Sequence, residues 1–250
     1  MKQLLHKNVH FIGIGGIGMS ALAKLLLANG CSVSGSNMNQ NDQTELLQSR
    51  GVKIFLKHEA DNLNENIDAV VHTSAVNDSN IEIITAKERG LPIYDYHEYL
   101  GLIAQQYKTI AISGTHGKST TTAIVASILT EAGLDPTVIV GSKVPGLDGN
   151  FRFGKSQILV VEADEFNFGM LHLRPDILLL NNIEADHLDC YKSLDNIINS
   201  FAKFAEQIAD NGCLIYNNDD KNVLSFVSQV KVKKISVGCK QSDVIYKKIN

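Results

Sequence analysis

The chain lacks the cysteine pairs from which disulfide or zinc frameworks are built. Its 250 residues include four cysteines, which lie far apart and form no C-x-x-C pair. Such spacing excludes a small disulfide-stapled or zinc-stapled fold and favours reduced thiols. We therefore expect a cytoplasmic protein. The four cysteines are Cys31, Cys190, Cys213 and Cys239.

Long apolar runs and an excess of positive charge are also missing. No apolar stretch approaches the roughly 20 residues that span a membrane, and the first residues lack the apolar segment of a signal peptide. The chain has 23 basic and 27 acidic residues, for a formal net charge of −4. A general affinity for nucleic acid is not expected from that balance. We expect no membrane or nucleic-acid partner, so any nucleotide binding has to be local.

The chain does contain a regular alternation of strand-like and helix-like segments. This alternation predicts an α/β fold with mostly parallel sheets and right-handed crossovers. The pattern restarts at Lys108, which divides the chain into a Rossmann-like domain, 1–106, and a second domain, 107–250. Expected strands cover 9–14, 31–35, 52–55, 68–73, 91–94, 108–113, 137–140, 157–162, 176–182, 213–216 and 233–237. Expected helices cover 19–29, 43–50, 81–89, 96–106, 119–132, 194–209 and 219–228.

Two stretches of the second half do not fit the alternation. Residues 141–154 are rich in glycine and polar residues, which is typical of a loop. Residues 241–250 close no recognisable unit, so we expect the second domain to be truncated and to leave a sheet edge or face uncovered.

A phosphate-binding loop is the most informative motif. A β-rich run, 109–113, leads into a glycine turn, then Lys-Ser-Thr, then a helical run. Backbone N–H groups of such a turn and the positive end of the helix dipole point at the same anion. Ile112 stands where the general pattern has a further glycine, so the loop is a shortened relative. The predicted ATP-binding residues are Gly114, Thr115, His116, Gly117, Lys118, Ser119 and Thr120.

A second glycine motif follows the first expected strand and fits the pattern G-x-G-x-x-G, which suits a diphosphate on a helix N-terminus. An NAD site would place an acid at the end of the next strand, where this chain has Asn37. The motif therefore favours another nucleotide diphosphate, and a glycine turn needed only for packing stays open. Hydroxyl residues after the strand at 68–73 could close over a phosphate or ribose. The candidate ligand residues are Gly13, Gly15, Gly16, Ile17, Gly18, Ser36, Asn37, His72, Thr73, Ser74 and Ala75.

Polar residues also follow two strands of the second half. Glu162 comes at the end of a buried strand, where α/β sheets bind ligands, and its carboxylate could hold Mg²⁺. Asp164 and Glu165 could instead be ordinary loop acids, and for Glu165 we favour that interpretation. His187 follows the next strand and is a candidate ligand of a second metal ion, with Asp186 and Asp189 able to orient it. We expect Ser119, Glu162 and His187 to converge at one edge of the sheet.

These motifs together resemble the Mur ligase family of ATP-dependent amide-forming enzymes. The resemblance covers almost the whole chain and rests on four segments, 10–20, 114–122, 162–165 and 182–189. It implies a Rossmann-like domain that binds a UDP-sugar, followed by an ATPase domain of the phosphate-loop type. By the same resemblance, Lys118, Glu162 and His187 are the catalytic residues. Lys118 contacts the ATP phosphates, Ser119 and Glu162 serve one Mg²⁺, and His187 serves a second.

The resemblance also implies a reaction. A ligase of this kind would use ATP to join L-alanine to the lactyl carboxylate of UDP-N-acetylmuramate through an acyl phosphate, in peptidoglycan precursor synthesis. Its partners would be UDP-N-acetylmuramate, L-alanine and ATP, and its cofactors ATP and Mg²⁺. Family members continue beyond the length of this chain, so we expect the fragment alone to be inactive. The alternatives are a muropeptide-recycling ligase and a non-catalytic nucleotide-binding fragment. An NAD-dependent oxidoreductase is disfavoured by Asn37 and by the phosphate loop.

Overall fold

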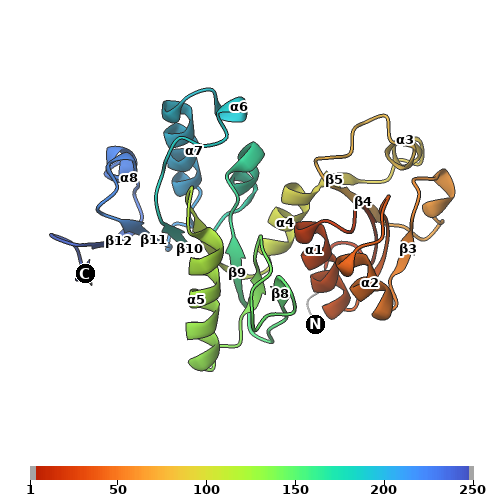
Figure 1. The fold of residues 1–250 in the computed structure, drawn as a ribbon, viewed down its shortest axis with the longest axis horizontal. Coiled ribbons are helices and arrows are strands. Elements are labelled where there is room, and N and C mark those ends of the chain that lie inside the picture. The colour runs from red at the N-terminus through yellow and green to blue at the C-terminus, as the bar shows by residue number, and fades with distance from the viewer. Residues whose placement is uncertain (1–3, 248–250) are drawn as a thin grey trace. The chain divides into compact units, whose positions relative to one another are not determined.

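The computed structural model describes residues 4–247, which form two compact units. The first unit holds the residues up to Ile103 together with Pro145–Phe153, which we call the returning segment. The second unit holds Ala104–Val144 and the residues from Gly154 onward. Each unit has its own sheet (Figure 1). The returning segment differs from the predicted division at 106/107, in which each domain is continuous in sequence.

The first unit contains a parallel sheet in the strand order β3-β2-β1-β4-β5. The chain moves outward from β1 to β3 and then restarts on the other side of β1 with β4. In parallel α/β sheets, ligands bind at the carboxyl ends of the strands where the order reverses in this way. The strands are β1 (Asn8–Ile12), β2 (Ser32–Ser36), β3 (Lys53–Phe55), β4 (Ala69–His72) and β5 (Ile93–Asp95).

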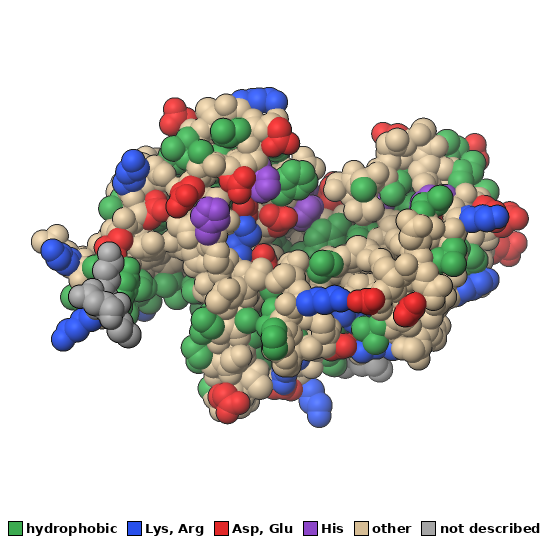
Figure 2. Space-filling model, viewed as in Figure 1, with side chains coloured by type: hydrophobic (Ala, Val, Ile, Leu, Met, Phe, Trp, Pro, Cys, Tyr) green, Lys and Arg blue, Asp and Glu red, His purple; other side chains and the backbone are tan. Residues whose placement is uncertain are grey.

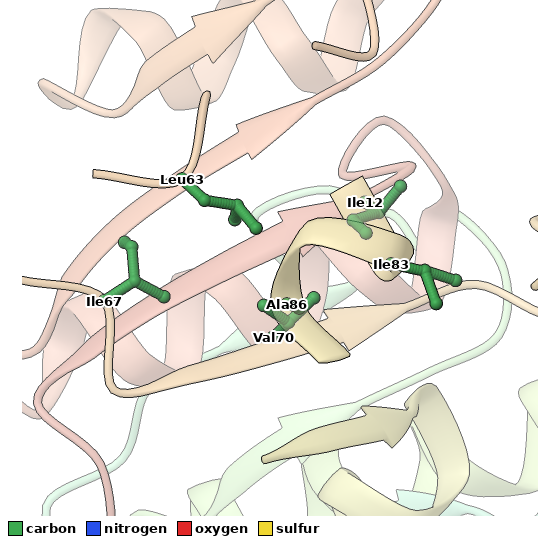
Figure 3. Close-up of a cluster of buried hydrophobic side chains, with 6 residues drawn as sticks. All are labelled: Ile12, Leu63, Ile67, Val70, Ile83 and Ala86. Carbon is green, nitrogen blue, oxygen red and sulfur yellow. The ribbon is translucent and has the colours of Figure 1, made fainter. Parts of the chain in front are cut away.

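Helices cover this sheet and bury its apolar strands. Ile12 of β1 and Val70 of β4 pack against Ile83 and Ala86 of α3, with Leu63 beside them (Figure 3). Burial of strands on both faces is the reason why they read as nearly continuous apolar runs in the sequence. The helices are α1 (Ile17–Ala28), α2 (Asp42–Ser49), η1 (Ala60–Asn62, a 3₁₀ helix), α3 (Ile81–Glu88) and α4 (Tyr96–Ala104).

The second unit contains a parallel sheet in the order β13-β12-β11-β10-β6-β9-β7. Its strands are β6 (Lys108–Ser113), β7 (Thr137–Ile139), β9 (Ile158–Glu162), β10 (Ile177–Leu180), β11 (Cys213–Asn217), β12 (Lys233–Gly238) and β13 (Val244–Ile245). Its helices are α5 (Lys118–Glu131), η2 (Phe166–His172), α6 (Leu188–Tyr191), α7 (Leu194–Glu206) and α8 (Lys221–Val227). Short strand β8 (Phe151–Arg152) lies in the returning segment.

One face of the second sheet is only half covered. Leu179, Ile215 and Ile235 are register partners on neighbouring strands, so their side chains share a face, and all three are half-buried. Leu178 and Leu214, which point to the opposite face, are fully buried. Since side chains alternate between the two faces of a strand, this contrast locates the open face on β10, β11 and β12. The expectation of an incompletely covered sheet is confirmed.

The strands and helices predicted from the sequence lie within a few residues of their predicted ranges, whereas several short elements were not predicted. The predicted strands correspond to β1–β7 and β9–β12, and the predicted helices correspond to α1–α5, α7 and α8. The sequence did not indicate η1, η2, α6, β8 or β13, each of which has seven residues or fewer. Among residues 4–247, no helix has both the length and the apolar character that crossing a membrane requires.

Candidate functional site

The segment between β6 and α5 has the strand–turn–helix geometry of a phosphate loop. Gly114 and Gly117 have φ angles of 135° and 79°, in the region that favours glycine. A Cβ atom on Gly114 would also lie 3.0 Å from the carbonyl oxygen of Asn182. Helix α5 begins directly at Lys118, so its first N–H groups and the positive end of its dipole face the loop.

Residues after β10 hold this loop in place. Asn182 accepts hydrogen bonds from Thr115 N (3.0 Å, to its carbonyl) and His116 N (2.8 Å, to Oδ1), and its Nδ2 donates to His116 O (3.0 Å). The backbone N of Glu184 donates to Thr115 Oγ1 at 2.9 Å. Asn182 therefore sets the loop conformation, a role that the sequence analysis missed. The available signal was an amide side chain directly after a buried strand.

Lys118 is fully engaged within the protein. Its ammonium donates to the carbonyl oxygens of Gly114 (2.9 Å) and Thr115 (3.2 Å) and to Oε1 of Glu165 (2.8 Å). An ammonium has three donors, so these acceptors saturate it. The cation lies at the mouth of the loop, where an incoming phosphate would have to replace one of these partners.

Glu165 is the buried counter-ion of Lys118, and the interpretation of Glu165 as a loop acid was wrong. The residue is 2% exposed, and its carboxylate lies 2.6 Å from the ammonium. Burial raises the pKa of Glu165, although the hydrogen bond and charge of Lys118 oppose the rise. The hydroxyl of Tyr191 donates to the Glu165 carbonyl oxygen, which fixes the backbone beneath the carboxylate. Burial of a residue just after a strand depends on what packs over it, which the local sequence does not reveal.

Ser119 and Glu162 lie side by side, although 43 positions separate them in the sequence. The Ser119 hydroxyl donates to Glu162 Oε1 at 3.2 Å, and Gly141 N donates to Oε2 at 2.8 Å. Ser119 lies in the first turn of α5 and Glu162 ends β9, so both stand at the carboxyl edge of the sheet. A hydroxyl and a carboxylate in contact provide the oxygen ligands that Mg²⁺ prefers.

His187 lies beside the Lys118–Glu165 pair. Its Nε2 is 3.9 Å from Glu165 Oε1 and 4.0 Å from Asp186 Oδ2, and its ring packs edge-on against Phe166. No group of three histidine, cysteine or acidic side chains within residues 4–247 is arranged to hold a metal ion. Joint metal binding by Ser119, Glu162 and His187 therefore stays a prediction. Figure 2 shows histidine, acidic and lysine side chains gathered over the N-terminal end of α5.

The glycine turn of the first unit is held by residues that follow β2. Gly13 N and Ile14 N donate to the carbonyl oxygen of Ser36 at 2.8 and 3.1 Å. Gly15 N donates to Asn37 Oδ1 at 3.1 Å. The N–H groups at the start of α1 remain without helical acceptors, as at every helix N-terminus. They are the available donors for an anion at this turn.

The other predicted residues of this turn separate into two groups. Thr73 lies against it, because Thr73 N donates to Ile12 O at 3.1 Å and a Cβ atom on Gly13 would lie 2.5 Å from Thr73 Cγ2. His72 also contacts Thr73, whose carbonyl is 3.1 Å from His72 Nδ1, and Ser74 and Ala75 are exposed. The Ser36 side chain, in contrast, is fully buried and its hydroxyl donates to Glu82, so it faces the protein interior.

Comparison with known families identifies both units. The model of the Mur ligase family catalytic domain matches residues 8–108, and that of the Mur ligase middle domain matches residues 112–250. The chain belongs to the Mur ligase family. The resemblance inferred from the phosphate loop, the glycine turn and the two strand-end motifs is thereby confirmed.

Several relatives of this Mur ligase chain carry related names. It is 45% identical to a UDP-N-acetylmuramate–L-alanine ligase of Clostridium novyi, over 98% of this chain and 53% of the relative. A crystal structure of UDP-N-acetylmuramate–alanine ligase from Thermotoga maritima is 33% identical, with a TM-score of 0.81 over 94% of this chain and 53% of that one. The crystal structure of a murein peptide ligase from Psychrobacter arcticus is 27% identical, with a TM-score of 0.81, and the match covers 92% of this chain and 53% of that one. The chain thus spans about half the length of these relatives.

Proposed function

We propose that this chain provides the UDP-sugar-binding unit and the ATP-binding unit of a ligase that joins L-alanine to UDP-N-acetylmuramate. In that reaction the γ-phosphoryl group of ATP passes to the lactyl carboxylate, and the amine of L-alanine attacks the resulting acyl phosphate. The contact between Ser119 and Glu162 beside the Lys118 loop is the observation that carries the proposal.

The roles of the residues at the loop follow from the chemistry of phosphoryl transfer. The protein contributes mainly positioning and charge neutralisation to such a reaction. Lys118 would contact the β- and γ-phosphates after giving up one of its present acceptors. The N–H groups at the start of α5 would receive phosphate oxygens.

Mg²⁺ fits the oxygen atoms of Ser119 and Glu162. A hydroxyl and a carboxylate 3.2 Å apart can both ligate one hard cation. The ion would screen the repulsion between the anionic carboxylate substrate and the triphosphate. His187 would serve a second ion, because its imidazole lies next to Glu165 beside the phosphate loop.

The first unit would bind the UDP-sugar through the Gly13–Gly18 turn. Asn37 supports this choice, because its amide oxygen is bonded to Gly15 N and no carboxylate stands there to hold the ribose hydroxyls of NAD. The relatives at 42–45% identity carry the alanine ligase name, and the murein peptide ligase is 27% identical. We therefore favour the alanine-adding reaction over muropeptide recycling.

Calorimetric titration of the chain with UDP-N-acetylmuramate and with NAD tests the nucleotide-sugar assignment. We expect UDP-N-acetylmuramate to bind more tightly, because its diphosphate uses the turn and its recognition does not need an acid at position 37. Gly15→Ala should weaken this binding, since a Cβ atom there would lie 2.8 Å from the amide nitrogens of Asn37 and Asn41. Tighter binding of NAD would overturn the assignment.

A further inference from the structure

A saturated carboxylate is buried close to the glycine turn of the first unit. Glu82, at the start of α3, is fully buried. Its Oε1 lies 3.1 Å from His10 Nε2 and 2.8 Å from Asn62 Nδ2, and its Oε2 lies 2.6 Å from both Ser36 Oγ and His58 Nδ1. An ionised carboxylate offers about four acceptor positions. Each of these positions has a partner.

The network reaches the turn through a single residue. Ser36 donates its hydroxyl to Glu82, and its carbonyl oxygen accepts the N–H groups of Gly13 and Ile14. The orientation of Ser36 therefore fixes two consecutive peptide groups of the turn. Asn37, the next residue, fixes a third peptide group of the turn, because its Oδ1 accepts a hydrogen bond from Gly15 N.

Packing alone does not account for a carboxylate at this position. The cluster on the same helix, which includes Ile83 and Ala86, is apolar (Figure 3). A buried charge costs free energy, and well-packed apolar residues often replace buried ionic groups without loss of stability. The partners of Glu82 come from β1, the end of β2, η1 and the loop before η1, so the carboxylate sets the position of several elements at once.

We propose that Glu82 is a positioning residue of the nucleotide-sugar site, which acts through Ser36 to hold the Gly13–Gly18 turn in its anion-binding conformation. This inference rests on the proposed binding of a UDP-sugar at that turn. It also gives Ser36 a different role from the direct ligand expected from sequence. The Ser36 hydroxyl orients the turn, and the N–H groups at the start of α1 receive the diphosphate.

The test is titration with UDP-N-acetylmuramate of the 250-residue chain in five forms, which are wild type, Glu82→Gln, Ser36→Ala, the double variant with both of these changes, and Glu88→Gln. Glu88 is an exposed acid on the same helix and serves as the matched control. We expect the Kd to rise about tenfold or more for Glu82→Gln and for Ser36→Ala, since small misplacements of binding groups have effects of that size. Glu88→Gln should stay within about twofold of wild type, as expected for a substitution away from the site. If Glu82 acts through Ser36, the double variant should bind no more weakly than the poorer single variant.

Amide hydrogen exchange separates positioning from a purely structural role. Exchange at Gly13 and Ile14 should become faster in Glu82→Gln and Ser36→Ala, at a temperature where circular dichroism shows both variants folded. A structural role alone would lower the unfolding midpoint and leave the Kd and the exchange of the turn unchanged, which would overturn the inference. If Glu82→Gln does not fold, Ser36→Ala alone decides the question. Absence of binding by the wild type would refute the proposed UDP-sugar site and the inference with it, whereas binding that is equal in all folded variants would refute only the inference.

Discussion

Lys118 and Glu165 form a buried ion pair, so a change at either residue affects stability as well as ligand binding. The two side chains are 13% and 3% exposed. Removal of one partner leaves the other charge buried without compensation, which costs about 3–5 kcal/mol, whereas removal of both charges costs far less. A simple alanine substitution of Lys118 therefore cannot separate its role in binding from its role in folding.

We predict that Lys118→Met destabilises the protein by about 3–5 kcal/mol and that the double variant Lys118→Met, Glu165→Gln recovers most of this loss. ATP should bind weakly to both variants, because neither has a cation at the loop. Urea unfolding and ATP titration measure the two effects. Lys203→Met, at an exposed lysine of α7, is the control for loss of charge. Undiminished ATP affinity in the double variant would show that Lys118 does not contact the phosphates.

Glu82 gives the first unit a predictable response to acid. Burial raises the pKa of Glu82, but hydrogen bonds from His10, Ser36 and Asn62 outweigh it and hold the pKa below its ordinary value of 4.5. An acid whose folded pKa is depressed contributes stability above its unfolded pKa and loses it as the pH falls through the folded pKa. The stabilising effect of the charge should therefore be complete above about pH 5.5.

The prediction is a pH-dependent difference between wild type and Glu82→Gln. The difference in free energy of unfolding should shrink as the pH falls below the unfolded pKa of about 4.5 and should be lost below the folded pKa of Glu82, where both proteins carry a neutral side chain at this position. Urea unfolding from pH 3 to 7 measures it. His10 and His58 face the same carboxylate and can also titrate. The variant His58→Gln is therefore measured at each pH, to separate the effect of this histidine from that of Glu82. A difference that does not change over the whole range would mean that Glu82 is not ionised in the folded protein.

At the scale of elements, apolar periodicity was sufficient to predict the strands and the main helices, but not the segments that tertiary contacts shape. α7 illustrates the first case: buried Ile197, Phe201 and Phe204 recur at helical spacing on one face. The segment around η2 illustrates the second. Asn167 and Phe168 have positive φ angles, and the Phe168 ring packs on Tyr191, more than 20 positions away. Such contacts have no local signature.

The returning segment depends on contacts of the same kind. Asn150 Nδ2 donates to Ile17 O at 2.8 Å, at the beginning of α1. Lys24, almost fully buried on the same helix, donates to Asp148 O at 2.9 Å and to Asn150 Oδ1 at 3.3 Å. A run of glycine and polar residues reads as a loop, and its partners on α1 lie more than 120 positions away. The sequence therefore did not indicate that residues 145–153 would join the first unit.

We predict that Asn150→Ala destabilises the first unit by about 1–3 kcal/mol, because it removes two buried hydrogen bonds, the one that Asn150 accepts from the Lys24 ammonium and the one that it donates to the Ile17 carbonyl. Urea unfolding followed by a probe in the first unit measures the change. Asn66→Ala, at an exposed loop position, is the control and should alter stability by less than about 0.5 kcal/mol. Equal stability of the two variants would show that the returning segment contributes little to the first unit.

At the scale of the whole molecule, sequence motifs predicted the family, because each of the two glycine loops follows a strand and opens a helix. Burial of the strand-end residues was not predictable in the same way. Ser119 and Glu162 were expected to meet, since carboxyl ends of parallel strands share an edge. The Glu82 network and the Lys118–Glu165 pair were missed, since each depends on how segments far apart in sequence pack together.

The last prediction is that the 250-residue chain by itself does not form the amide product. The amine of L-alanine has to reach the acyl phosphate in a site that excludes water, or water hydrolyses the intermediate. In this chain the phosphate loop is open, since His116, Gly117 and Thr120 are exposed, and one face of the second sheet is half covered. The relatives it matches are about twice as long. We therefore expect the chain to bind the UDP-sugar. At most, we expect it to release phosphate from ATP without forming the amide.

The assay combines phosphate release with mass spectrometry for UDP-N-acetylmuramoyl-L-alanine, in the presence of ATP, Mg²⁺, UDP-N-acetylmuramate and L-alanine. The double variant Lys118→Met, Glu165→Gln serves as the control for contaminating ATPase. This variant lacks the cation of the phosphate loop and leaves no unpaired charge buried there. Phosphate released without the amide would mean that the loop transfers a phosphoryl group but that the acyl phosphate is exposed to water. Amide product formed at about 1 s⁻¹ or faster, an ordinary enzyme rate, would contradict the prediction and would show that the open loop of these two units excludes water well enough for the complete reaction.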